Sequence, residues 1–185
     1  ENLAMTAESG LSVLRLASDR FEVIAAPERA RELKSAVAQA AVQVAPAVWN
    51  GFDIRSGIPY ITPDTQGEFV PQMANLDLIG GISFNKGCYP GQEIVARMHF
   101  LGRLKQRMYL ANIATNEVPA SGARLYSAQF GDQACGTVMN AAPSPDGGSD
   151  VLAVIQIVSA GHGDVRVGSP DGPPLKLLEL PYRVA

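Results

Sequence analysis

The middle of the chain holds a cysteine on a glycine-rich turn, which is the residue and setting best suited to chemistry. Residues 86–97 read KGCYPGQEIVAR. Gly87 and Gly91 permit backbone conformations that a β-carbon would block, and Pro90 fits the first position of a helix. The pattern predicts a loop that runs into a helix, with Cys88 just before the helix N-terminus.

The surroundings predicted for this thiol favour its ionised form. Gln92 and Glu93 fall in the first helical turn, where acceptors and negative charge are favoured. The free N–H groups of that turn, the positive end of the helix dipole and Lys86 would stabilise a Cys88 thiolate, whereas burial would oppose it. An activated thiol is one interpretation. The other is a structural turn over an inert, packed cysteine, which the residues alone favour because a lone cysteine without an assigned base is a weak catalytic signal.

A family resemblance reverses that preference. Residues 86–93 resemble the signature of the YgfZ family, K-G-C-Y-x-G-Q-E, and match it at every specified position. Further matching segments are 55–59 (RSGIP), 69–72 (FVPQ), 75–77 (NLD), 80–84 (GGISF) and 95–97 (VAR). The resemblance covers essentially the whole chain.

The resemblance implies a T-protein-like fold around a folate site, related to the glycine-cleavage T-protein. The family supports assembly or repair of iron-sulfur enzymes in a folate-dependent way, and its loss affects tRNA methylthiolation. Tetrahydrofolate or another folate is the implied cofactor. Folate, iron-sulfur client enzymes and, indirectly, the tRNA pathway are the implied partners, and a monomer is compatible with this role. The functional cysteine carries over to Cys88, and binding of folate or substrate carries over to Lys86, Tyr89, Gly91, Gln92, Glu93 and Arg97.

Two other functions stay open. An aminomethyltransferase of the T-protein class would share the fold and the folate, but T-proteins lack the cysteine signature of residues 86–89. An RNA-binding or structural module would make Cys88 incidental. The family supplies no settled reaction, so an enzyme class is left open; a tetrahydrofolate-dependent one-carbon transferase is the class that the resemblance would allow.

The chain is shorter than the family pattern. Family members have a further N-terminal region that contributes several pterin-facing residues, and this chain does not start with Met. We expect a fragment of a longer protein, with weak folate binding when it stands alone.

Basic residues gather around the cysteine segment. Lys86, Arg97, Arg103, Lys105 and Arg107 place five of the fifteen basic residues within 22 positions, opposed only by Glu93. Such a cluster could bind the glutamate tail of a folate, or RNA phosphates. For residues 103–107 we favour a solvated face and a strand edge guarded by charge. For Arg97, inside the signature, we favour the site.

Composition excludes several classes of protein. With 46% hydrophobic and 18% charged residues, the 185-residue chain can bury a core. The net charge of −3 gives no global reason to expect a polyanion. No apolar run approaches the roughly 20 residues of a membrane helix, and residues 1–5 show no secretion signal. Two separated cysteines and two histidines predict neither a disulfide framework nor a metal site. We expect a cytoplasmic protein without a membrane partner.

The first half of the chain predicts mixed structure. Residues 11–16 and 21–26 indicate a β-hairpin, residues 27–42 an amphipathic helix that starts at Pro27, and residues 48–58 a short helix stopped by glycine and proline. Residues 59–86 are rich in proline and glycine, which predicts long irregular loops laid on a scaffold.

The second half predicts strands. Strand-like runs cover residues 104–113, 123–128, 134–140, 151–158 and 175–180. Cys135 lies within one of them, where a small buried residue is expected. The predicted fold is α+β: residues 1–102 form the remnant of a ferredoxin-like, folate-binding α+β domain that carries the KGCYPGQE motif, and residues 103–185 form a C-terminal antiparallel β-barrel.

Overall fold

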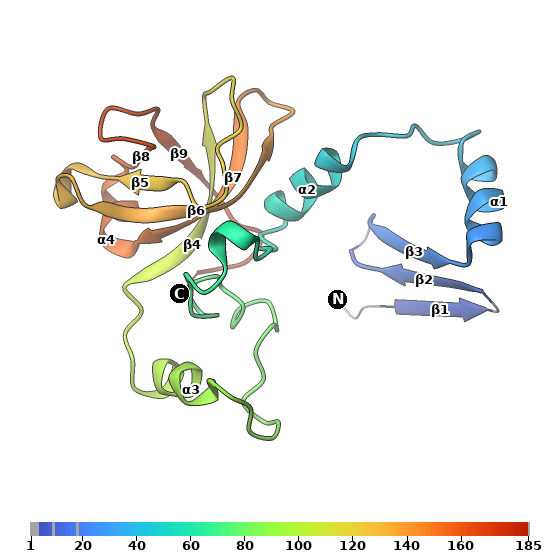
Figure 1. The fold of residues 1–185 in the computed structure, drawn as a ribbon, viewed down its shortest axis with the longest axis horizontal. Helices are drawn as coiled ribbons and strands as arrows, with labels where there is room; N and C mark the ends of the chain where they lie inside the picture. Colours follow the sequence, from blue (N-terminus) through green and yellow to red (C-terminus); the bar gives the residue numbers. More distant parts are fainter. Residues whose placement is uncertain (1–3, 9, 18, 185) are drawn as a thin grey trace. The chain divides into compact units, whose positions relative to one another are not determined.

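The fold combines helices with antiparallel sheets. A computed structural model describes residues 4–8, 10–17 and 19–184. The chain divides into two compact units, residues 1–44 and 45–185 (Figure 1). The boundary predicted near Gly102 falls inside the second unit, and it stays a prediction. No helix among the described residues combines the length and hydropathy needed to cross a bilayer.

The first unit is a three-stranded sheet followed by a helix. Strands β1 (Ala4–Glu8), β2 (Leu11–Arg15) and β3 (Phe21–Ala25) pair antiparallel in that order. The β2–β3 pairing confirms the predicted hairpin. Helix α1 (Pro27–Val37) begins at the predicted proline but ends five residues before the predicted Val42. Its side chains are mostly exposed, so no apolar surface supports a further turn.

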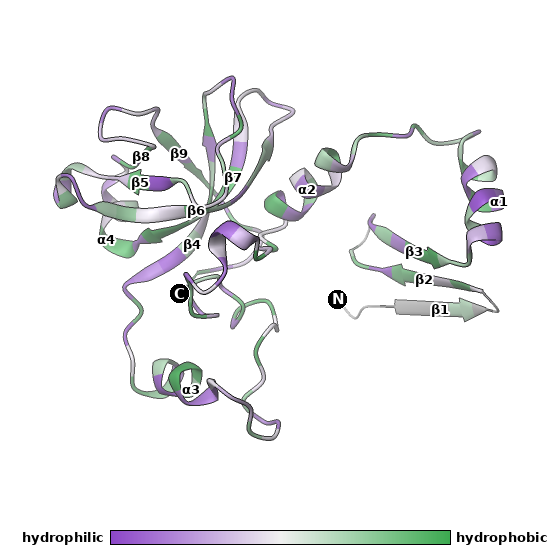
Figure 2. Ribbon diagram, viewed as in Figure 1, coloured by the Kyte–Doolittle hydropathy of each residue, from purple (hydrophilic) through white to green (hydrophobic). Residues whose placement is uncertain are grey.

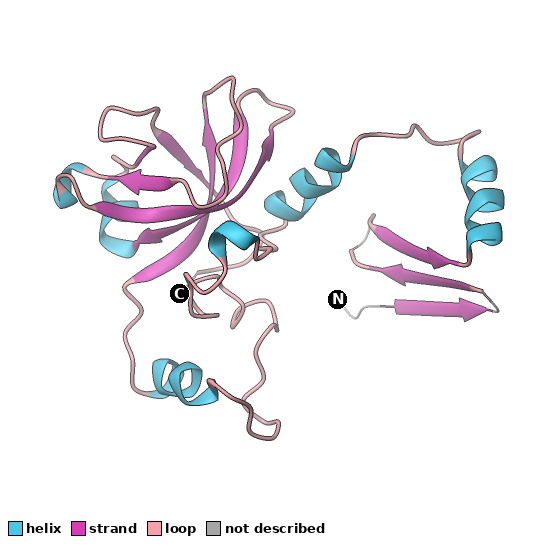
Figure 3. Ribbon diagram, in the orientation of Figure 1, coloured by secondary structure: helices cyan, strands magenta, loops and turns pink. Residues whose placement is uncertain are grey.

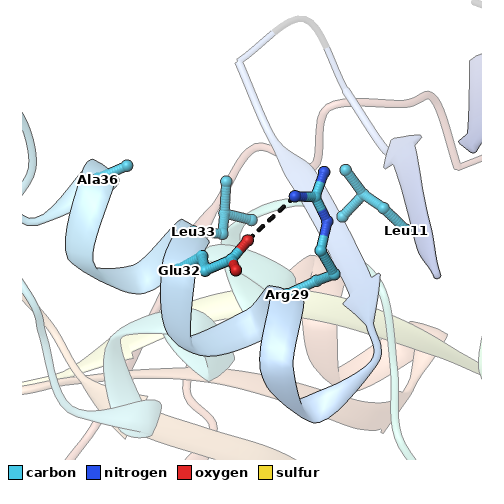
Figure 4. Close-up of a pocket in the computed structure, with 5 residues that line it drawn as sticks. All are labelled: Leu11, Arg29, Glu32, Leu33 and Ala36. Atoms are coloured by element: carbon cyan, nitrogen blue, oxygen red, sulfur yellow. Dashed lines mark hydrogen bonds and ion pairs between the residues drawn. The ribbon is translucent and has the colours of Figure 1, made fainter. Parts of the chain in front are cut away.

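The first unit has little core of its own. Among the side chains that the structure describes in residues 1–44, none is buried. A hollow of about 210 Å³ lies between β2 and α1, lined by Leu11, Arg29, Glu32, Leu33 and Ala36. Figure 4 shows Arg29 beside Leu11, reaching Glu32 in a 3.0 Å ion pair. The helix therefore covers the sheet loosely.

The second unit is built on a curled antiparallel sheet. Its strands are β4 (Gln106–Ile113), β5 (Arg124–Tyr126), β6 (Ala134–Pro143), β7 (Ser149–Gln156), β8 (Arg166–Val167) and β9 (Leu175–Leu178). Their order is β8-β5-β6-β7-β4-β9. All five predicted runs contain a strand. The sheet curls so far that edge strand β8 bridges Pro174, the residue before the other edge strand, β9 (Figure 1). This curled sheet occupies the place of the predicted β-barrel.

The second unit also contains short helices. They are α2 (Pro46–Arg55), α3 (Gln92–Phe100) and α4 (Ile157–His162), with single turns η1 (Pro63–Thr65) and η2 (Ala128–Phe130). Between α2 and α3 the chain is mostly loop, as predicted (Figure 3). Helix α4 starts where the sequence predicted two more strand residues, because the backbone turns away after Gln156.

Hydrophobic side chains pack on both faces of the central strands. Along β7, Val151, Ala153 and Ile155 join one buried cluster, and Leu152 and Val154 join the other. Cys135 lies in the first cluster and is fully buried, as predicted. Ile54 of α2 lies in the second cluster, so α2 covers this face of the sheet.

Polar contacts fix the end of α2 to the sheet. Arg55 donates from Nε to Asp150 and from Nη2 to Asp146 and Ser144. Just beyond, the Tyr182 hydroxyl donates to the Gly57 carbonyl at 2.8 Å. Gly57 has φ +67°, and a β-carbon there would lie 2.6 Å from the Tyr182 ring. The C-terminal tail thus fits over a position that requires glycine.

The contact between Arg55 and Asp150 predicts a pH-dependent stability. Burial alone would raise the pKa of the Asp150 carboxyl, but hydrogen bonds from Asn112 and Arg55 outweigh it and lower that pKa. A lowered pKa means that this stabilisation is complete above the unfolded value of about 3.9 and is lost as the pH falls through the folded value. Asp150→Asn should lower the free energy of unfolding at pH 7 by about 1 to 2 kcal/mol.

Urea unfolding at a series of pH values checks this. The difference between wild type and Asp150→Asn should shrink below about pH 4. Asp146→Asn is the matched control, because the Asp146 side chain is 78% exposed and its loss should change little. A difference between wild type and Asp150→Asn that stays constant with pH would contradict this account.

Candidate functional site

The cysteine segment forms an exposed loop that leads into α3. Gly91 is the N-cap residue and has φ +86°, a left-handed conformation that favours glycine. The Tyr89 N–H donates to Oε1 of Gln92 at 3.2 Å, which closes the turn. Gln92 and Glu93 lie in the first turn, as predicted. Pro90 does not occupy the first helical position: because Gly91 makes the turn, the helix starts at Gln92, two residues later than the proline alone suggested.

Cys88 lies on the surface of this loop. Its side chain is exposed, so Cys88 is not packed under the turn, and an activated thiol stays a prediction. Lys86 and Tyr89 flank it, with the Lys86 Nζ 5.2 Å from the centre of the Tyr89 ring. This contact holds a positive charge over an aromatic face, between two residues that flank Cys88 in the sequence. The loop therefore presents a reachable thiol with a cation close by in the sequence.

A hydrogen bond from a buried glutamine holds the inner face of helix α3. Val95 is the buried residue of α3, and its carbonyl accepts a 2.6 Å hydrogen bond from Nε2 of Gln72. The opposite face of α3 is exposed and mixed in character (Figure 2). Arg97 lies on this exposed face in the last turn, whereas His99, also in the last turn, lies four residues after Val95 and therefore on the side of Val95. The ring of His99 stacks on Phe84 with centroids 4.1 Å apart.

Arg107 connects the long loop to the sheet. Its guanidinium binds both carboxylate oxygens of Asp77, at 2.7 and 3.0 Å, and donates to the Gln72 carbonyl at 2.8 Å. The side chains of Arg107 and Asp77 are only 9% and 14% exposed. The prediction of a solvated strand edge is therefore wrong for Arg107. Strand β4 is not an edge either, because it pairs with both β7 and β9.

The other basic residues remain at the surface. The exposed ones are Lys86, Arg97, Arg103 and Lys105. For Arg103 and Lys105, which precede β4, this confirms the predicted solvated face. The basic cluster thus separates into one buried anchor and four surface charges.

An open hollow lies between the end of α3 and the start of β4. Its volume is about 430 Å³. Its polar lining comes from Gln72, Asp77, His99, Arg103 and Arg107, and its apolar lining from Met98, Leu104 and Ile157. Arg103 and Arg107 are the members of the basic cluster that line it. The cysteine segment, residues 86–91, is not part of it.

Two residues that build this region had no role predicted from the sequence. Gln72 and Asp77 lie in segments that resemble the family, and the structure shows that they attach the loop to α3 and β4. Asp77 and Arg107 are 30 positions apart and share no local pattern, so pairing them from the sequence would have required information on contacts. In the part of the chain that the structure describes, no group of three or more His, Cys, Asp or Glu side chains could hold a metal ion.

Breaking the buried ion pair should cost far more than breaking an exposed one. Asp77→Asn leaves the Arg107 charge buried without its partner, so we expect a loss of about 3 kcal/mol in the free energy of unfolding. Arg107→Met in the Asp77→Asn background should recover part of this, because it removes the unpaired charge. Glu68→Gln is the matched control: its ion pair with Arg124 is exposed and should contribute at most about 1 kcal/mol.

Urea denaturation of the wild type and the three variants measures these differences. Equal costs for Asp77→Asn and Glu68→Gln would show that the buried pair is not an anchor.

Three curated relatives of this chain carry the same family description. No family model matches the chain. Each of the three relatives is described as a tRNA-modifying protein YgfZ. The protein from Yersinia enterocolitica is 34% identical over 177 residues, 95% of this chain and 53% of the relative. The one from Colwellia psychrerythraea is 38% identical over 141 residues, 74% of this chain and 42% of the relative. The one from Yersinia pestis is 34% identical over 172 residues, 92% of this chain and 52% of the relative.

The chain spans about half the length of the curated relatives it matches. The alignment with the Yersinia enterocolitica relative covers nearly all of this chain, both units included, and is not confined to the cysteine motif. This chain belongs to the YgfZ family.

Proposed function

We propose that this chain is part of a folate-binding accessory protein that supports the assembly or repair of iron-sulfur enzymes and, through them, tRNA modification. The observation that carries the proposal is the complete KGCYPGQE motif with its cysteine exposed on a loop. The relatives named as tRNA-modifying proteins support the connection to tRNA.

In this proposal, the thiol of Cys88 is the functional group. It is exposed, whereas Cys135 is fully buried and its pKa is raised by burial. A buried thiol with a raised pKa stays protonated and unreactive at neutral pH. Cys88 is thus the cysteine that a partner protein can reach, either as a redox-active thiol or as a transient ligand.

The cofactor proposed is tetrahydrofolate or another folate. In this proposal Lys86, Tyr89, Gly91, Gln92, Glu93 and Arg97 form its binding surface together with Cys88. The fold proposed for the whole protein is T-protein-like, with a ferredoxin-like region in residues 1–102 and a closed barrel in residues 103–185. The curled sheet and the loosely covered first unit are compatible with such a fold.

An aminomethyltransferase of the T-protein class is the competing function. It would use the same folate, but it has no need for an exposed cysteine. The Lys86–Tyr89 segment therefore favours the accessory role.

Replacing Cys88 should separate function from stability. Cys88→Ser changes an exposed loop residue, so the free energy of unfolding should stay within about 0.5 kcal/mol of wild type. The same variant should fail to restore iron-sulfur enzyme activity and tRNA methylthiolation in cells that lack the full-length protein. Cys135→Ser is the matched control: it should cost about 1 to 3 kcal/mol through a buried hydroxyl but should retain activity in cells.

Full rescue by Cys88→Ser would remove the thiol from the mechanism. Alkylation of the two thiols gives an independent reading, because Cys88 should react in the folded protein and Cys135 only after unfolding.

The charge on α3 should matter for the folate tail. If Arg97 binds carboxylates of the glutamate tail, the full-length protein should bind polyglutamyl tetrahydrofolate more tightly than the monoglutamate, and salt should reduce the difference. Arg97→Ala should remove much of this preference. Lys176→Ala, which removes an exposed charge from β9, should leave it intact. Isothermal titration at two salt concentrations tests this, and equal affinities for both folates under all conditions would exclude a role for the tail.

A further inference from the structure

Helix α3 exposes large apolar side chains close to the cysteine segment. Ile94, Phe100 and the C-cap residue Leu101 are 62%, 69% and 83% exposed. Their helical spacing places them on the side of α3 away from Val95, which is the one buried side chain among the nine described residues of this helix. A helix this short gains most of its stability from the packing of an apolar face. Ile94, Phe100 and Leu101, the apolar outer face of α3, therefore lack the surface that would normally cover them.

Basic residues border this outer face. Arg103 and Lys105 follow Leu101 within four positions, and both are exposed. Residues 86–105 carry four basic side chains against one carboxylate, that of Glu93, although the net charge of the chain is −3. A local positive surface on a negative chain favours a partner that carries carboxylates around its contact surface.

The side chains of the outer face favour a protein over a nucleic acid or a folate. Ile94 and Leu101 are aliphatic and have no ring on which a base could stack, and stacking is the usual way in which unpaired bases are held. The rings of a folate require a concave site, and the hollow beside α3 has none of the three apolar residues in its lining. Exposed apolar side chains bordered by charges are typical of protein–protein interfaces.

The charges within this face argue against a permanent cover by another part of the same protein. Glu93 and Arg97 lie on the same side of α3 as the apolar residues, and both are exposed. A permanent cover would remove these charges from water, which is costly unless each of them is paired. A non-obligate interface keeps charged groups at a solvated rim. The mixed face is therefore suited to a partner that binds and dissociates.

We propose that the outer face of α3 docks the iron-sulfur enzyme that this protein serves, through an apolar patch of that enzyme bordered by carboxylates. A standard interface of about 800 Å² per partner extends beyond the roughly 13 Å length of α3. A partner on this face therefore also reaches the exposed loop of Cys88, four residues before the helix begins. This inference rests on the proposed function and deepens it, because it names the surface on which the partner lies.

The residues of the contact can be changed without touching the proposed folate surface. Its members Ile94, Phe100, Leu101, Arg103 and Lys105 are all exposed, and none of them is assigned to the folate. Variants at these positions should therefore bind tetrahydrofolate like the wild type.

The test measures binding of a purified tRNA methylthiotransferase, an iron-sulfur enzyme, to the full-length protein by isothermal titration. The double variant Ile94→Ser/Leu101→Ser should weaken binding by about tenfold or more, because two aliphatic side chains lose their apolar contacts. Val158→Ser is the matched control, because Val158 is 58% exposed on another helix, α4, and its replacement should leave the affinity unchanged.

A second pair of variants tests the charges. Lys105→Glu should slow association with the methylthiotransferase, and added salt should reduce the difference from wild type. Lys176→Glu makes the same change in net charge at an exposed position of β9 and should not slow association. Stopped-flow association rates at two salt concentrations provide the comparison.

The same variants show whether the outer face is free in the full-length protein. Ile94→Ser/Leu101→Ser and Val158→Ser should unfold at the same urea concentration as wild type, because the replaced side chains are exposed. A loss of stability confined to the double variant would mean that the rest of the same protein covers α3, and it would overturn the proposal.

Three binding results would also overturn it. They are no binding of the methylthiotransferase by the wild type, equal binding by Ile94→Ser/Leu101→Ser and Val158→Ser, and tRNA binding that the double variant loses, which would assign the face to RNA. Cys88→Ser distinguishes this inference from the proposed function, because it should dock the enzyme normally and still fail to restore its activity. Restored activity would refute the role of the thiol and leave the docking surface standing, whereas normal binding by the double variant would refute only the docking surface.

Discussion

The buried ion pair between Arg107 and Asp77 determines where the cysteine segment lies. Residues 59–86 are mostly loop and cannot fix their own position through regular hydrogen bonding. Arg107 lies in an inner strand of the sheet, and it holds both Asp77 and the Gln72 carbonyl. Two charges removed from water are retained only when they are well paired, and the bidentate contact meets that condition. The loop is therefore attached to an inner strand of the sheet.

From that anchor a short chain of contacts leads to the thiol. Gln72 accepts from Arg107 through its backbone and donates to Val95 through its side chain. This fixes the middle of α3, and α3 carries the turn at Gly91. The cysteine segment itself makes few such contacts and stays exposed. A fixed helix with an accessible loop at its N-terminus suits a group that must meet a partner protein, because the loop can adapt while its base holds still.

The sequence predicted what local patterns determine and missed what depends on distant contacts. Strand-like runs were enough to identify five of the six strands of the curled sheet, all but the two-residue β8, and Pro27 marked the start of α1. The end of α1 was misplaced because apolar spacing continues where no surface remains to cover. Arg107 was misread because charge alone does not distinguish an exposed cation from one whose partner lies 30 positions away. Likewise, Pro90 is a good helix starter, but the left-handed turn at Gly91 decides where α3 begins.

Helix α3 joins two regions of different chemistry without merging them. Its nine residues span about 13 Å, with the cysteine segment at its N-terminus and the hollow at its C-terminal end. A small ligand in the hollow would thus lie too far from Cys88 to react with it directly. The two regions are nevertheless connected through Gln72, because its Nε2 holds the middle of α3 and the same residue lines the hollow.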